Sequence, residues 1–109
     1  MAEPTIEQVF GANSTQNLDD WVISKSDLQS VGLTPSATNT AESLFVALFL
    51  MAKIYLNQIN QQTNPDIQVT IEDGFPSLVE RNGITYRQRS FNVYLETPDS
   101  GSEIDPDNF

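Results

Sequence analysis

The chain of 109 residues contains no cysteine and no histidine. It therefore has no thiol nucleophile, no serine–histidine pair, and none of the thiolate or imidazole ligands by which proteins usually hold zinc and haem. No disulfide can form, so the cysteine content gives no indication of a redox compartment. These absences exclude several common kinds of catalytic and metal site, and we expect no cofactor and no bound metal.

Basic residues are scarce: five lysines and arginines stand against 15 aspartates and glutamates, for a formal charge of −10. An acidic surface repels phosphate groups, so we expect no nucleic-acid partner. Two carboxylate pairs, Asp19-Asp20 and Glu72-Asp73, are the main acid–base groups. Adjacent residues on a strand point to opposite faces, so neither pair converges by sequence alone. We therefore expect that the protein is not an enzyme.

Long hydrophobic runs are also missing. The longest run, residues 44–52, has nine residues, whereas a membrane-spanning helix needs about 20. Residues 1–7 contain neither the basic segment nor the apolar segment of an export signal. We expect no membrane partner and a cytoplasmic location, or a place in the virion if the protein is viral.

The residues that are present are typical of one globular domain. Hydrophobic residues make up 39% and charged residues 18% of the chain, and a chain of this length supports one modest core. Composition divides the chain into three parts. Residues 1–17 are polar and predict an N-terminal arm, residues 18–95 predict a single α+β domain, and residues 96–109 predict an acidic C-terminal tail.

A long helix is predicted over residues 40–61, which contain no glycine or proline and are rich in helix-forming side chains such as alanine and leucine. Asn39 followed by Glu42 indicates where the helix starts, and Asn64-Pro65 indicates where it ends. One broad apolar stripe of the helix is expected to pack on a sheet. It consists of Ala41, Leu44, Phe45, Leu48, Phe49, Ala52, Tyr55, Leu56 and Ile59.

A second, narrower apolar ridge runs along the same helix and is formed by Val46, Leu50 and Ile54 at four-residue spacing. A helix that is apolar on nearly all sides is normally buried on all sides. Two interpretations are equally open. Either the N-terminal segment or the strand around Trp21 folds over the ridge, or another subunit covers it, since exposed apolar patches mark interfaces.

Antiparallel strands are predicted after the helix. Residues 67–71 alternate apolar and polar side chains, and strands at residues 75–81 and 84–95 follow the hairpin signals Asp73-Gly74 and Asn82-Gly83. The predicted fold class is therefore α+β. One long helix packs on an antiparallel sheet, made of a C-terminal β-meander and an N-terminal strand, and is flanked by an extended N-terminal arm and the acidic tail.

Two tight turns fix the predicted register of these strands. Leu78 is expected to face Val69 on one side and Arg87 on the other. The last strand is longer than its partner. Residues 90–95 are therefore expected to pair elsewhere, either with the strand around Trp21 or with another chain.

Charge is segregated along the C-terminal part of the chain. Three arginines against one glutamate give residues 77–95 a charge of +2, and five carboxylates give residues 96–109 a charge of −5. One interpretation is a weak intrachain ion pair between Glu80 and Arg87. The other is that the arginine hairpin of one copy receives the acidic tail of a neighbouring copy.

We interpret the chain as a non-enzymatic structural or adaptor subunit that self-associates as a homo-oligomer or docks in a larger protein assembly, such as a phage virion, capsid or tail. The alternative is an acidic regulator or inhibitor that binds a basic site on a partner protein. A third hypothesis is a small enzyme or ligand-binding domain that uses Glu80, Tyr86 and Arg87. The predicted interface residues are Val46, Leu50, Ile54, Arg81, Arg87, Arg89, Glu103, Asp105, Asp107 and Phe109.

Overall fold

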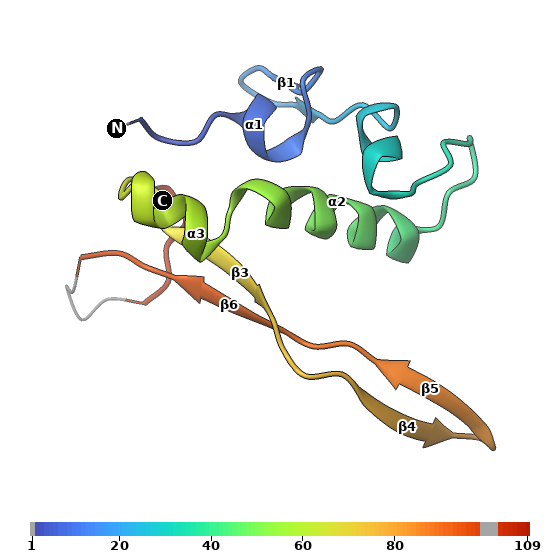
Figure 1. Ribbon diagram of the computed structural model, residues 1–109. Helices are drawn as coiled ribbons and strands as arrows, with labels where there is room; N and C mark the ends of the chain where they lie inside the picture. The colour runs from blue at the N-terminus through green and yellow to red at the C-terminus, as the bar shows by residue number, and fades with distance from the viewer. Residues whose placement is uncertain (1, 99–102) are drawn as a thin grey trace.

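The structure is a computed structural model that describes residues 2–98 and 103–109. The long predicted helix forms a middle layer, an N-terminal segment lies on one side of it, and antiparallel strands lie on the other side (Figure 1). The expected α+β class, with a long helix and antiparallel strands, is confirmed. Part of the predicted acidic tail, residues 99–102, lies outside the described residues.

The long helix is bent at one asparagine. It forms as α2, Ala41–Tyr55, and α3, Gln58–Thr63. Between them the Asn57 side chain accepts a hydrogen bond from the backbone N–H of Asn60 at 2.9 Å and donates one to the carbonyl of Ile54 at 3.0 Å. Because one amide side chain caps the end of α2 and the start of α3, the helix changes direction without leaving these backbone groups unpaired.

The ends of the helix lie close to the predicted signals. Thr40 is the N-cap, and its hydroxyl accepts a hydrogen bond from the backbone N–H of Ser43 at 3.1 Å. The predicted cap, Asn39, instead accepts a hydrogen bond from the backbone N–H of Ser36 at 3.0 Å within the preceding loop. The helical segment stops immediately before Asn64-Pro65, as predicted.

The N-terminal residues fold against α2. α1, Ile6–Phe10, begins with a capping box between Thr5 and Gln8. Val9 is only 5% exposed and belongs to the core, packed against α2. The expectation of an extended arm over residues 1–17 is therefore corrected. The apolar side of this short capped helix packs against the apolar side of α2.

The rest of the N-terminal layer consists of short elements. β1, Thr15–Gln16, pairs with β2, Trp21–Val22, and the 3-10 helix η1, Asp27–Val31, follows. The ring of Trp21 lies 4.7 Å from the ring of Phe10, edge to face. The N-terminal strand predicted around Trp21 is therefore present, but it pairs with β1 and not with the C-terminal strands.

The C-terminal strands are β3, Val69–Asp73, β4, Ser77–Arg81, β5, Ile84–Gln88, and β6, Phe91–Leu95. β3 pairs with β6 and β4 pairs with β5, both antiparallel. At the predicted Asn82-Gly83 turn both residues have positive φ, 53° and 77°, as a type I′ hairpin requires. β4 continues in the direction of β3, so the four strands form one long, bent, two-stranded hairpin (Figure 1).

The strand pairing corrects part of the predicted register. Leu78 faces Arg87 as predicted, whereas Val69 faces Leu95 and not Leu78. The first hairpin signal does not reverse the chain, because Pro76 favours an extended backbone at the residue before it. The sequence predicts that residues 90–95 pair with the strand around Trp21 or with another chain. Residues 91–95 instead form β6 and pair with β3.

The buried core is small and divided between two sides of α2. One cluster joins α1, α2 and β3, and the other joins η1 and α2. The first contains Val9, Ala52 and Ile71 with Phe49, Leu56 and Phe91, and the second contains Leu28, Leu33 and Ala47 with Leu44 and Met51. Three members of the predicted stripe, Ala41, Phe45 and Ile59, are exposed instead, because the elements around α2 are too short to cover its whole circumference.

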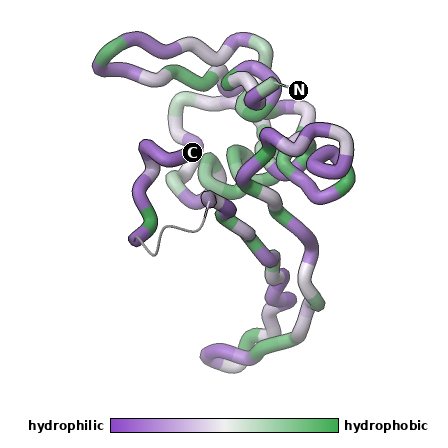
Figure 2. Tube along the Cα trace, turned by 90° about the vertical axis from the view of Figure 1, so that its left-hand side faces the viewer, coloured by the Kyte–Doolittle hydropathy of each residue, from purple (hydrophilic) through white to green (hydrophobic). Residues whose placement is uncertain are grey.

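The molecule is extended for its size. Its radius of gyration is 16.3 Å, compared with about 13 Å for a compact domain of this length. Its accessible surface is 8190 Å², compared with about 6,000 Å² for a compact monomer of this mass. The paired strands β4 and β5 account for much of the shape, because they leave the body and project away from the helices (Figures 1 and 2).

Candidate interaction surface

The ridge predicted on α2 is uncovered. Val46 is 53% exposed, Ile54 is 62% exposed, and Leu50 between them is half-buried. Neither the N-terminal segment nor β2 folds over these residues, since α1 packs on the side of α2 that carries Ala52. The interpretation in which the chain covers its own ridge is therefore wrong.

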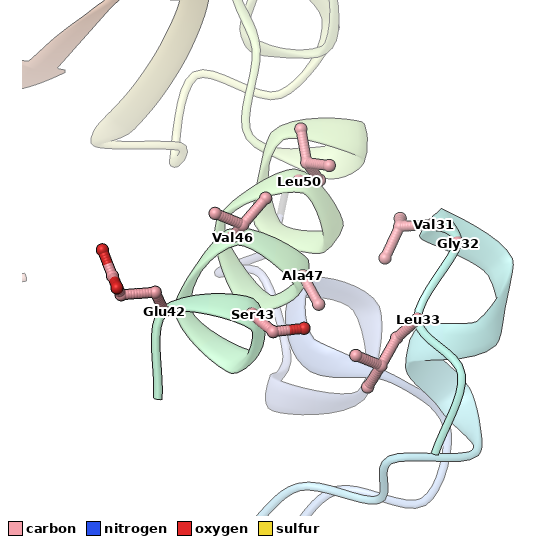
Figure 3. A pocket seen from close by; sticks show the side chains of 8 residues that line it. All are labelled: Val31, Gly32, Leu33, Glu42, Ser43, Val46, Ala47 and Leu50. Atoms are coloured by element: carbon pink, nitrogen blue, oxygen red, sulfur yellow. The ribbon is translucent and has the colours of Figure 1, made fainter. Parts of the chain in front are cut away.

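The ridge lies within a continuous apolar groove, called the α2 groove below. A hollow of about 330 Å³ between α2 and η1 and a hollow of about 470 Å³ between α2 and β3 share Val31 and Leu50. Figure 3 shows the first hollow, with side chains of α2 on one side and Val31 and Leu33 on the other. The two hollows are lined by Val31, Gly32, Leu33, Glu42, Ser43, Val46, Ala47, Leu50, Lys53, Ile54, Asn57, Ile59, Ile71, Glu72 and Asp73.

Carboxylates lie at both ends of the α2 groove. Glu42 is exposed in the first turn of α2. At the other end the Asp73 carboxylate lies 2.6 Å from the Lys53 ammonium, and Glu72 accepts a hydrogen bond from the backbone N–H of Gln58 at 2.8 Å. The three carboxylates outnumber the one ammonium group. The groove therefore has an acidic border around its apolar floor.

The hairpin formed by β4 and β5, called the arginine hairpin, is exposed along almost its whole length, as are its predicted site residues Arg81 and Arg87 and the adjoining Arg89. The guanidinium of Arg81 stacks over the ring of Tyr86 at 4.6 Å. Among the described residues the one ion pair is between Lys53 and Asp73. The ion pair considered between Glu80 and Arg87 is therefore not formed.

The acidic tail lies at the other end of the molecule. Residues 103–109 are exposed, and they turn back toward the start of β3, where the Gln68 side chain donates a hydrogen bond to the carbonyl of Asn108 at 3.3 Å. The hairpin tip points away from this end (Figure 1). Within one chain the predicted site residues thus form three separate patches: the ridge, the arginine hairpin and the tail with Glu103, Asp105, Asp107 and Phe109.

The polar groups considered for a ligand site, Glu80, Tyr86 and Arg87, do not share one face. Leu78 and Glu80 lie on one face of the arginine hairpin together with Arg87, whereas Tyr86 lies on the opposite face, across from Val79. Among residues 2–98 and 103–109 there is no group of three or more acidic side chains placed to hold a metal ion.

The sequence pattern does not indicate the residues that line the groove opposite α2. Val31 and Leu33 come from η1 and the segment after it, and Asp73 comes from the end of β3. The hydrophobic pair Val31 and Leu33 around Gly32 is a local signal for an apolar contact, but it does not name the partner. Asp73 has no such signal, because its place in the groove depends on contacts between distant parts of the chain.

By length and composition alone, the helical segment Ala41–Thr63 is long and apolar enough to cross a membrane. This is weak evidence, because the core helix of a soluble protein meets the same criteria. The break at Asn57 also leaves α2 with 15 residues, or about 22 Å of helix, and the hydrocarbon core of a bilayer is about 30 Å thick.

No protein-family model, no curated protein and no solved structure matches the chain. The molecule's distinguishing features are those of its surface: an α+β body with an uncovered apolar groove, an exposed arginine hairpin and an acidic tail.

Proposed function

We propose that this chain is a non-enzymatic structural or adaptor subunit that self-associates or docks in a larger protein assembly, with the α2 groove as its interface. The observation that carries the proposal is the apolar groove on a molecule with too much surface for its mass. The accessible surface of 8190 Å² exceeds that of a compact monomer by about 2,000 Å². A stable protein interface removes about 1,200–2,000 Å² from water over both partners, or about 800 Å² per partner, so the excess surface of one chain is more than enough for such an interface.

The weakness of the core supports the same proposal. In the part of the chain that the structure describes, two of the seven buried hydrophobic residues are alanines, Ala47 and Ala52, and Ile67 is the largest apolar side chain below 2% exposure. Large apolar side chains such as Phe45, Ile54 and Phe75 remain exposed. Burying apolar surface is the main favourable term in folding and association, so an interface supplies the burial that the monomer lacks. A phage capsid or tail, or an assembly in the cytoplasm, is the setting we propose.

An acidic regulator or inhibitor is the second candidate, and the exposed carboxylates of the tail favour it. Glu103, Asp105 and Asp107 are all solvent-accessible and carry negative charge. Binding through such groups weakens steeply as salt is added, whereas association through the apolar α2 groove resists salt. Salt dependence therefore separates the two proposals.

The test is the mass in solution of three purified proteins, measured by sedimentation velocity at low and high salt. The natural chain is expected to exceed its monomer mass of 12.1 kDa at both salt concentrations. Val46→Asp is expected to be a folded monomer, because the substituted side chain is exposed in the isolated chain. Leu18→Asp adds the same charge at a residue that is 98% exposed and lies outside the groove, so it is expected to assemble normally.

Circular dichroism establishes that each variant is folded. The proposal fails if the natural chain stays at its monomer mass at every concentration, or if Val46→Asp assembles as well as Leu18→Asp does.

A further inference from the structure

The arginine hairpin is a second surface without a partner in the monomer. Every residue of β5 is exposed, and in β4 only Val79 is half-buried. The hairpin points away from the helices and the N-terminal layer (Figures 1 and 2). A two-stranded hairpin by itself is marginally stable in water and normally needs a third strand or a packing surface. We therefore expect the exposed hairpin to pack on another surface.

One face of the hairpin is suited to an apolar surface with an acidic border. Val79, Ile84 and Tyr86 lie on this face, because Val79 is paired with Tyr86 and Ile84 is paired with Arg81. Arg81 shares the face and stacks on the Tyr86 ring. The face thus presents apolar side chains beside a cation, within a segment that carries net positive charge.

The α2 groove has the complementary character. Its floor is apolar around Leu50, and carboxylates lie at its two ends, Glu42 at one and Glu72 at the other. The lengths also match. The part of α2 that lines the groove, residues 42–55, is about 20 Å long, and a hairpin of two five-residue strands with its turn is about 16–20 Å long.

We infer that the α2 groove of one copy is occupied by the arginine hairpin of a second copy. The inference rests on the proposed function and names the partner of that interface. Apolar side chains of this face fill the groove, and Arg81, the arginine on the same face, lies against the carboxylates at one end. Opposite charges on the two surfaces favour this pairing over groove against groove, where like charges would meet.

The hairpin of the same copy does not reach its own groove, because its base is fixed. The backbone N–H of Gly74 donates to the carbonyl of Ser90 at 2.8 Å, and the Ser90 hydroxyl donates to the carbonyl of Phe75 at 3.0 Å. These bonds hold the junction between the two strand pairs and direct the hairpin outward. Each copy therefore offers one hairpin and one groove, which are different patches, so contact is heterologous.

A mixing experiment tests the pairing. Ile84→Asp disables the hairpin at a residue that is 56% exposed, and Val46→Asp disables the groove. Each variant alone is expected to be a monomer of 12.1 kDa. Mixed in equal amounts they are expected to double in mass, because the intact hairpin of the Val46→Asp chain enters the intact groove of the Ile84→Asp chain. As a control, mixing Val46→Asp with Ile54→Asp combines two disabled grooves and is expected to leave monomers.

The outcomes separate this inference from the proposed function. If Ile84→Asp assembles like the natural chain while Val46→Asp does not, the groove is an interface but the hairpin is not its occupant, and the inference is overturned alone. If both variants are monomers and their mixture stays monomeric, the inference is overturned as well. If deleting residues 103–109 abolishes assembly and Val46→Asp does not, the tail receives the hairpin instead. A natural chain that never exceeds the monomer mass overturns both proposals.

Discussion

Replacing Ile54 by alanine gives a quantitative test of the α2 groove. The side chain is 62% exposed in the isolated chain, and burying a whole isoleucine side chain contributes about 1.5–3 kcal/mol. If an interface covers the exposed part, Ile54→Ala should weaken association by about 1–2 kcal/mol. This corresponds to an increase in Kd of about 5- to 30-fold. Since the same side chain contributes little to the monomer, the free energy of unfolding should change by less than about 0.5 kcal/mol.

Sedimentation equilibrium over a dilution series measures the Kd, and urea unfolding of the dilute monomer measures the stability. Leu18→Ala, at the most exposed apolar side chain of the β1–β2 turn, is the matched control and should change neither quantity. If Ile54→Ala leaves the Kd unchanged, or raises it no more than Leu18→Ala does, then no interface covers the Ile54 side chain.

Three further predictions concern the fold that presents these surfaces. Val9→Ala should lower the free energy of unfolding by about 1–3 kcal/mol in urea titrations, because it leaves a cavity between α1 and α2; an unchanged midpoint would mean that α1 is not part of the core. Thr40→Ala should cost about 1 kcal/mol in the same titration, because it removes the N-cap of α2, and a neutral effect would contradict that cap. Gly83→Ala should destabilise the turn by about 1 kcal/mol, because φ at this residue is positive. NMR contacts between Arg81 and Ile84 should therefore weaken, and contacts as strong as in the natural chain would be evidence against the turn.

The helix and the second turn were predictable because their signals are local. Residues 40–61 lack helix breakers, and Asn82-Gly83 matches the backbone that a type I′ turn requires. The bend was not predictable by the same route, since Asn57 is only moderately unfavourable inside a helix. The helix breaks at Asn57 because the side-chain amide donates a hydrogen bond to the carbonyl of Ile54 and accepts one from the backbone N–H of Asn60.

The pairing of the C-terminal strands was not recoverable from turn signals alone. Asp73-Gly74 has the composition of a tight turn, but Pro76 follows two residues later and the chain runs on into β4. The choice between a meander and one long hairpin is made by contacts of high sequence separation, such as Ile71 with Val93. Periodicity identifies which residues form strands but does not identify their partners.

Part of the candidate surface was visible in the sequence. The ridge Val46, Leu50 and Ile54 follows from helical spacing. Its exposure comes from the structure, because the sequence left open whether the N-terminal segment or the strand around Trp21 covers it. The groove around the ridge was not visible, because Val31 and Asp73 join it from distant parts of the chain. The sequence pattern thus indicates one wall of the groove, and tertiary contacts supply the others.

Residue-level labelling measures directly whether the α2 groove is the surface buried on assembly. Photogenerated carbene labelling of the natural chain, followed by mass spectrometry, reports the accessibility of Val46 and Ile54 at concentrations above and below the Kd. Their labelling is expected to fall as concentration rises, while labelling of Leu18 does not change. Equal labelling of Val46 and Ile54 at all concentrations, in a sample whose mass shows assembly, would mean that the α2 groove is not the interface.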